Sequence, residues 1–172
     1  MKYSIHSKKT FQLKKNEIMQ ICKLKNSFWK FGLRSNLHWF RNNIKRNDLH
    51  NLIFVNFKLI GYTVLRINSL FKNKNKNKIK YFYFDTLIID KKYRSNKLSS
   101  ILMHFNNQVI LNNKKISFLI CKKKMIKFYE KFCWKLLNKK YFEIKDHKFS
   151  SYGMFFNNKL MTKTKYDIYL YR

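Results

Sequence analysis

Residues 78–103 read KIKYFYFDTLIIDKKYRSNKLSSILM, and this stretch decides the fold. Its first part, Lys78–Asp90, is rich in aromatic and β-branched residues, which predicts a central strand buried on both faces. The polar loop KKYRSNKLSS follows, and Leu98–Leu111 then carries apolar residues at helical spacing. A strand, a short loop and a helix in direct succession aim backbone N–H groups and the positive helix end at one point. The sequence therefore predicts an anion site at this junction.

Outside this stretch, helical and strand patterns alternate with no break in composition and no internal repeat. Helices are expected over Lys14–Leu24, from an N-cap at Ser35 to Ile44, and over Met125–Phe132. Strands are expected in a hairpin over Asn51–Ile67, at Lys114–Cys121, from Trp134 to Leu137, and at Tyr166–Arg172. Asn73–Lys78 is predicted to be an exposed loop, and Tyr141–Thr164 has no assignable pattern. This order predicts one α/β (α+β) domain over residues 1–172, a mixed, mostly antiparallel sheet of six to seven strands with about four helices covering both faces.

The charge of the chain has two interpretations. Lys and Arg total 39 against 8 Asp and Glu, a formal net charge of +31. Proline and alanine are absent and glycine numbers 3, a bias toward residues with AT-rich codons. The lysines are then either a solvated surface without a dedicated partner, or a field that attracts nucleic acid, an anionic membrane or phosphorylated ligands. Non-specific nucleic-acid binding at low salt is possible either way. Left-handed backbone positions must be filled by residues such as Asn, Ser or Lys.

Several classes of protein are excluded by what the sequence lacks. It contains no run of about 18 apolar residues for a membrane span, and its start has no apolar signal segment. Cys22, Cys121 and Cys133 are widely spaced and fit reduced thiols. Five scattered His and no CxxC make a zinc site unexpected. We therefore expect a cytoplasmic protein that binds neither a metal nor a membrane.

Two segments together resemble the GNAT acyltransferase superfamily. The family signature Arg/Gln-x-x-Gly-x-Gly/Ala is matched by Arg94, with Lys97 at the first Gly and Ser99 at the Gly/Ala. Residues 128–134, FYEKFCW, are similar to the family's F-Y-E-K-x-G-F/W, with Cys133 at the glycine. The hairpin ending in LIGYTVLRI resembles the family's third strand, so the resemblance covers roughly Asn51–Leu137.

The resemblance implies an N-acetyltransferase that moves an acetyl group from acetyl-CoA, its co-substrate, to a primary amine by direct attack in a ternary complex. Backbone groups of the strand end would hold the pantetheine arm and polarise the thioester carbonyl: Leu87, Ile88 and Ile89. The loop would hold the pyrophosphate: Arg94, Ser95, Asn96, Lys97, Leu98, Ser99 and Ser100. Tyr129 stands where the family places its general acid, beside the leaving thiolate. The alternative for Tyr129 is a packed helix aromatic.

Other assignments stay open at this point. Asp85 is a candidate base or anchor for the acceptor amine, or else a structural acid paired with a lysine. Asp48 and His50 precede the first hairpin strand, and His50 is either a base or a lone loop histidine. The whole chain is alternatively a basic, aromatic-rich nucleic-acid-binding protein, or a GNAT-fold scaffold without catalysis. The sequence does not indicate the amine acceptor or the oligomeric state.

Overall fold

The computed structural model describes residues 2–72, 78–146, 151–157 and 165–171, without the side chains of Ser95 and Asn96. The chain divides into two compact units: unit 1 is Met1–Arg66 with Asp85–Asn106, and unit 2 is Ile67–Phe84 with Asn107–Arg172. Two long strands run through both units, β3 (Lys58–Lys72) and β4 (Lys78–Ile89). The helix α3 (Leu98–Asn112) also begins in unit 1 and ends in unit 2. Most of the predicted loop Asn73–Lys78 lies outside the described residues.

The sheet of unit 1 has the strand order β1 (Ser4–Lys9), β2 (Leu49–Val55), β3, β4. β1 pairs antiparallel with β2, and β2 pairs antiparallel with β3. The turn between β2 and β3 consists of Asn56 and Phe57, whose φ angles are 46° and 62°. Two successive left-handed residues are typical of a type I′ hairpin turn, which usually contains glycine. The predicted hairpin is confirmed, with asparagine and phenylalanine where glycine is usual.

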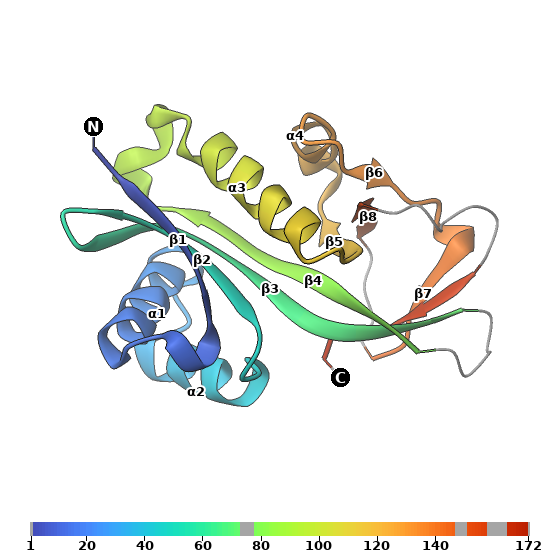
Figure 1. The fold of residues 1–172 in the computed structure, drawn as a ribbon, viewed down its shortest axis with the longest axis horizontal. Coiled ribbons are helices and arrows are strands. Elements are labelled where there is room, and N and C mark those ends of the chain that lie inside the picture. Colours follow the sequence, from blue (N-terminus) through green and yellow to red (C-terminus); the bar gives the residue numbers. More distant parts are fainter. Residues whose placement is uncertain (1, 73–77, 147–150, 158–164, 172) are drawn as a thin grey trace. The chain divides into compact units, whose positions relative to one another are not determined.

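Both faces of this sheet are apolar, because neighbouring residues of a strand point to opposite sides. One face packs against α1 (Lys15–Trp29) and α2 (Leu33–Asn43) through Leu52, Leu59 and Ile88. Their chain neighbours Ile53, Ile60 and Ile89 point the other way and pack against Leu98 and Leu102 of α3. Helices therefore cover both faces of the sheet in unit 1, as the sequence predicts (Figure 1).

The start of α2 differs from its prediction. The helix begins at Leu33, so Ser35 lies inside its first turn and is not the N-cap. Gly32 precedes the helix with φ of 89°, and its N–H donates to Asn26 Oδ1 at 2.8 Å. α1 ends at Trp29 with Lys30 in the left-handed region (φ 54°), so three residues connect the two helices. The connection therefore has positive φ at Lys30 and at Gly32, and one of the three glycines of the chain stands at the second of these positions.

Unit 2 extends β3 and β4 on both sides. β5 (Ser117–Cys121) lies parallel to β4, pairing Phe82 with Ser117 and Tyr83 with Phe118. Further strands on that side are β8 (Tyr152–Phe156), antiparallel to β5, and β6 (Lys135–Leu136), antiparallel to β8. On the other side β9 (Tyr166–Ile168) pairs antiparallel with β3, and β7 (Phe142–Ile144) pairs parallel with β9. The helix α4 (Ile126–Glu130) connects β5 to β6.

The fold class is confirmed as a mixed, mostly antiparallel sheet with four α-helices, but the described residues contain nine strands and not six to seven. β1 was not predicted because it is a polar edge strand with no apolar alternation. β7 and β8 lie in Tyr141–Thr164, where β8 is the short, mostly apolar run YGMFF. The polar loop after β4 forms a 3-10 helix, η2 (Lys91–Asn96).

Candidate functional site

The predicted anion site lies in unit 1, where β4 ends and η2 begins. Asp90 caps η2, since its Oδ1 accepts from the Lys92 amide at 3.0 Å and its Oδ2 pairs with Lys58 Nζ at 3.2 Å. Burial would raise the pKa of Asp90, but these two partners outweigh it and hold the pKa below its usual value. Arg94 Nε donates to the carbonyl of Ile89 at 3.2 Å, so the turn is tied back to the strand end. The structure thus brings the predicted pantetheine segment and phosphate loop together.

The backbone of this loop keeps the shape that a glycine would give it. Lys97 stands at the first glycine of the signature and has φ of 52°, in the left-handed region. The amides of Ser100 and Ile101 donate to the Lys97 carbonyl, at 3.0 and 3.2 Å. Those of Leu98 and Ser99 open the helix, where amides have no intrahelical partner. These amides at a helix start are suited to an anion such as a pyrophosphate.

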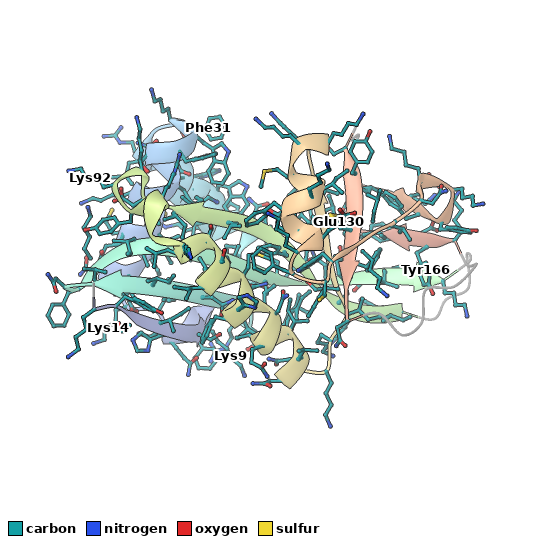
Figure 2. All side chains as sticks on the ribbon, turned by 90° about the horizontal axis from the view of Figure 1, so that it is seen from above. Lys9, Lys14, Phe31, Lys92, Glu130 and Tyr166 are labelled. Carbon is teal, nitrogen blue, oxygen red and sulfur yellow. The ribbon has the colours of Figure 1, made fainter. Side chains whose placement is uncertain are left out.

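The side chains around the loop are mostly basic. Lys92, labelled in Figure 2, is exposed, as are Lys91 and Lys97. The Arg94 guanidinium lies 5.5 Å from the ring of Phe28, so this side chain is held by a carbonyl and a ring. Leu98 is buried and fixes the helix start, and the side chains of Ser99 and Ser100 are half-buried. Ser95 and Asn96 belong to η2, and their side chains lie outside the described part.

The second glycine-like position is in unit 2, directly after α4. The Cys133 amide donates to the Glu130 carbonyl at 3.0 Å, and the Trp134 amide donates to the Tyr129 carbonyl at 3.3 Å. These two hydrogen bonds define a Schellman motif in which Cys133 is the left-handed residue, with φ of 63°. The segment FYEKFCW therefore ends its helix in the conformation that a glycine normally supplies.

Tyr129 is held by aromatic side chains of unit 2. Its ring meets Phe84 edge-on at 6.2 Å and lies 5.2 Å from Phe128 and 6.3 Å from Trp134. Burial, with a smaller contribution from Cys121, raises the pKa of the Tyr129 phenol above its usual value. Within the described residues the Tyr129 hydroxyl has no hydrogen-bond partner. It is therefore a protonated donor that none of these described residues engages as an acceptor.

One positioning residue of this region is not indicated by the sequence. Asn107 of α3 is buried, accepts from Trp134 Nε1 at 3.0 Å and donates to the Phe132 carbonyl at 2.9 Å. It thereby fixes both residues that flank Cys133. Nothing in the sequence around Asn107 indicates a buried side chain with hydrogen-bond partners. Those partners, Phe132 and Trp134, come from a distant segment of the chain.

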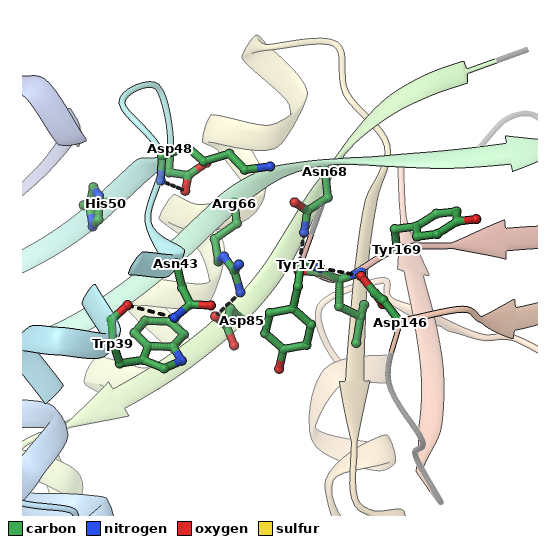
Figure 3. A network of polar contacts seen from close by, with 12 residues as sticks. Trp39, Asn43, Asp48, His50, Arg66, Asn68, Asp85, Asp146, Tyr169 and Tyr171 are labelled. Carbon is green, nitrogen blue, oxygen red and sulfur yellow. Dashed lines mark hydrogen bonds and ion pairs between the residues drawn. The ribbon is translucent and has the colours of Figure 1, made fainter. Parts of the chain in front are cut away.

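Asp85 is part of a charged cluster in unit 1. Its Oδ2 accepts from Arg66 Nη1 at 3.1 Å, while Arg66 is 2% and Asp85 17% exposed (Figure 3). Trp39 lies under the cations, with Lys25 Nζ 3.4 Å and the Arg66 guanidinium carbon 5.6 Å from its ring centroid. Burial lowers the pKa of Lys25 to about 8, although Asp85 partly opposes the shift. Asp85 is therefore ion-paired, as the structural alternative expected, but with an arginine and not a lysine.

Lys25 is a further buried charge that was not predicted, although the sequence carries a signal for it. It lies four residues after Ile21 and three after Cys22, which places it on the buried face of α1. A lysine on the apolar face of a helix indicates a buried cation that needs partners.

His50 does not lie on a loop, which corrects that expectation. It belongs to β2, is fully buried, and stacks between Phe40 and Tyr62. Thr10 Oγ1 donates to the Lys45 carbonyl at 2.6 Å, so it accepts from His50 Nε2 at 2.9 Å, and the Tyr62 hydroxyl donates to Nδ1 at 2.8 Å. Burial lowers the pKa of His50 to about 3. Both nitrogens are engaged, so His50 is a structural neutral histidine and not a base.

A cavity of about 500 Å³ also lies in unit 1, lined by Tyr3, His6, Glu17, Phe54 and Phe57 among others. None of the predicted site residues lines it. In the described part of the chain no three His, Cys, Asp or Glu side chains cluster as metal ligands would, and no helix has the length and apolar content to cross a membrane.

The left-handed cysteine allows a test of the glycine-like backbone. Replacing Cys133 by glycine is expected to stabilise the protein by about 1 kcal/mol, because an L side chain is strained at this φ and Cys133 is exposed. For a chain of this size the melting temperature should rise by about 2–4 °C in thermal unfolding. Cys133→Ala keeps the Cβ and should give no such rise. An equal gain from both variants would mean that loss of the thiol, and not relief of strain, stabilises the chain.

Comparison with known proteins agrees with the fold. No family model and no curated protein matches the sequence. An acyl-CoA N-acyltransferase from Pseudomonas aeruginosa is similar with a TM-score of 0.66 and 10% identity, over 90% of this chain and 99% of that one. Naa50 from Arabidopsis thaliana, solved with the bisubstrate analogue CoA-Ac-MVNAL, gives 0.59 and 19% identity over 88% and 97%. The PaiA N-acetyltransferase from Thermoplasma acidophilum, solved with coenzyme A, gives 0.55 and 15% identity over 88% and 98%. The chain therefore has the fold of the GNAT N-acetyltransferases.

Proposed function

We propose that residues 1–172 form one N-acetyltransferase domain, which transfers an acetyl group from acetyl-CoA to a primary amine by direct attack in a ternary complex. The observation that carries the proposal is the left-handed Lys97 at the start of α3. Lys97 and Ser99 stand at the glycines of the signature, yet the backbone has a left-handed turn that would present the first amides of α3 to a pyrophosphate. The similar Naa50 and PaiA structures contain a CoA-derived ligand or coenzyme A, which supports the same ligand class here.

The residues of unit 1 would hold the co-substrate. The loop Arg94–Ser100 would bind the pyrophosphate through backbone amides, with Lys97 adding charge. β4 continues from Phe84 to Ile89 beyond its last parallel pair with β5, so backbone groups of Leu87–Ile89 that do not pair with β3 would bind a pantetheine arm, apart from the Ile89 carbonyl, which accepts from Arg94. Acetyl-CoA supplies the thioester, and an N–H of this segment would polarise its carbonyl.

Tyr129 would donate a hydrogen bond to the leaving sulfur. A phenol with a raised pKa stays protonated at every working pH, and a thiol normally has a pKa of about 8.5. Full proton transfer to a thiolate is then uphill, so the hydrogen bond, and not complete transfer, is the contribution that we propose. Asp85 would anchor the acceptor ammonium, since its Oδ2 is taken by Arg66 and its Oδ1 has no hydrogen-bond partner within the described residues.

The test is acetyl transfer by the full chain. We expect calorimetry to show coenzyme A binding, and a panel of primary amines with acetyl-CoA to show thiol release above the rate of hydrolysis. Binding without thiol release for any amine would indicate the scaffold alternative. Absence of coenzyme A binding would remove the proposed function altogether.

A substitution in the loop tests the binding mode. Ser99→Glu places a carboxylate in the first turn of α3, where a pyrophosphate would lie, and should weaken coenzyme A binding at least tenfold through like-charge repulsion. Ser35→Glu is the matched control, because it adds the same charge to the first turn of α2 in the same unit. Calorimetric titration of both variants should show weakening only for Ser99→Glu. Equal affinities in the two variants would exclude this loop from the cofactor site.

A further inference from the structure

An exposed aromatic ring in unit 1 lies between two cations. Phe11 is 51% exposed, and its ring centroid is 5.9 Å from Lys9 Nζ and 5.2 Å from the guanidinium carbon of Arg46. Lys9 is itself exposed (Figure 2). Both distances fall within the range of cation–π contact, about 6 Å. The ring and the two charges therefore form one surface cluster, which we call the Phe11 platform.

The turn that carries this platform is fixed by hydrogen bonds. Phe11 lies in the 3-10 turn η1 (Thr10–Gln12), which joins β1 to α1. The Thr10 amide donates to the Asp48 carbonyl at 3.0 Å, and the Phe11 amide donates to the Arg46 carbonyl at 3.3 Å. Gln12 Oε1 accepts from the Lys9 amide at 2.8 Å. A rigid turn thus presents the ring to solvent, so a partner that stacks on it would lose little conformational entropy of the protein.

In the part of the chain that the structure describes, the two cations of the platform are not neutralised by carboxylates. Among the residues that the structure describes, neither Lys9 nor Arg46 forms an ion pair with an Asp or Glu. The whole chain has only 8 acidic residues against 39 Lys and Arg. The platform therefore suits a partner that has both a flat π-surface and negative charge.

We propose that the Phe11 platform binds single-stranded nucleic acid, with a base stacked on the Phe11 ring and adjacent phosphates paired with Lys9 and Arg46. Proteins that bind single strands with little sequence preference use exposed aromatic rings flanked by cations, because every base has a π-face and every nucleotide has a phosphate. An anionic membrane fits less well, since surface binding needs a broad apolar face and the platform offers one ring. This inference does not depend on acetyl transfer.

The test uses Phe11→Ala with Phe57→Ala as matched control. Phe57 is 95% exposed in the β2–β3 turn of the same unit, and no cation lies over its ring in the described residues. We expect fluorescence anisotropy with a labelled single strand of about ten nucleotides to show binding by the parent. Phe11→Ala should weaken it about tenfold, and Phe57→Ala should leave it unchanged. Lys9→Ala should reduce the slope of affinity against salt, which Phe11→Ala should not change.

Three results would overturn the proposal: no binding by the parent at low salt, equal affinities of the two phenylalanine variants, or a Phe11→Ala defect seen with vesicles of anionic lipid but not with the oligonucleotide. Equal affinities would assign the binding to diffuse lysine charge. Circular dichroism checks that Phe11→Ala folds, as the exposure of the ring leads us to expect.

Discussion

Tyr129→Phe is expected to slow acetyl transfer about 10²–10³-fold while leaving coenzyme A affinity nearly unchanged. The variant removes one oxygen and keeps the ring that packs on Phe84, Phe128 and Trp134, so the fold of unit 2 should persist. The loss arises because the leaving thiolate would no longer receive a hydrogen bond in the transition state. Single-turnover kinetics should be measured, since slow product release would hide part of the effect in steady state.

The pH profile separates Tyr129 from other groups. Because the pKa of its phenol is raised, the parent rate should not fall on the alkaline side through loss of this proton near the usual value of about 10. Tyr152→Phe, which removes a hydroxyl from β8 in the same unit, is the control and should keep the parent rate. If the single-turnover rates of Tyr129→Phe equal those of the parent, Tyr129 is a packed aromatic and the proposed role is wrong.

The sequence predicted the parts of the site that depend on neighbours along the chain. The strand, turn and helix predicted for residues 78–112 are confirmed. They could be predicted because the burial pattern of a strand and the apolar spacing of a helix are local signals. Lys97 and Cys133 stand where the resemblance expects glycine, and both have left-handed φ, which glycine adopts at no steric cost. The backbone at these two positions therefore has a glycine-like conformation without glycine, which agrees with the motif alignment made from the sequence.

The parts that were missed depend on contacts between distant segments. The partner of Asp85 comes from β3, so the ion pair with Arg66 needs the register of two strands, which a single sequence does not give. The environment of His50 needs Thr10, which follows the unpredicted strand β1, and Phe40 from α2. Burial of an isolated polar residue is thus decided by elements that cover it from elsewhere, and the sequence around His50 carried no sign of them.

That environment makes His50 a source of acid instability. An unfolded histidine has a pKa of about 6.5, while burial lowers the folded value to about 3. Between these pH values the unfolded chain binds one more proton than the folded chain, so stability falls as the pH falls from 6.5 toward 3. At about 1.4 kcal/mol per pH unit, the loss from this one group is on the order of 4 kcal/mol.

His50→Gln should remove this part of the pH dependence. Glutamine keeps a donor and an acceptor for Thr10 and Tyr62 but does not titrate. We expect the variant to be less stable than the parent at pH 7, because the stacking on Phe40 and Tyr62 is lost, yet to lose less stability on acidification. Urea unfolding at a series of pH values measures both quantities, and His38→Gln, an exposed change on α2, should follow the parent. If the stability of His50→Gln falls as steeply below pH 6.5 as that of the parent, carboxylates control acid unfolding and His50 does not.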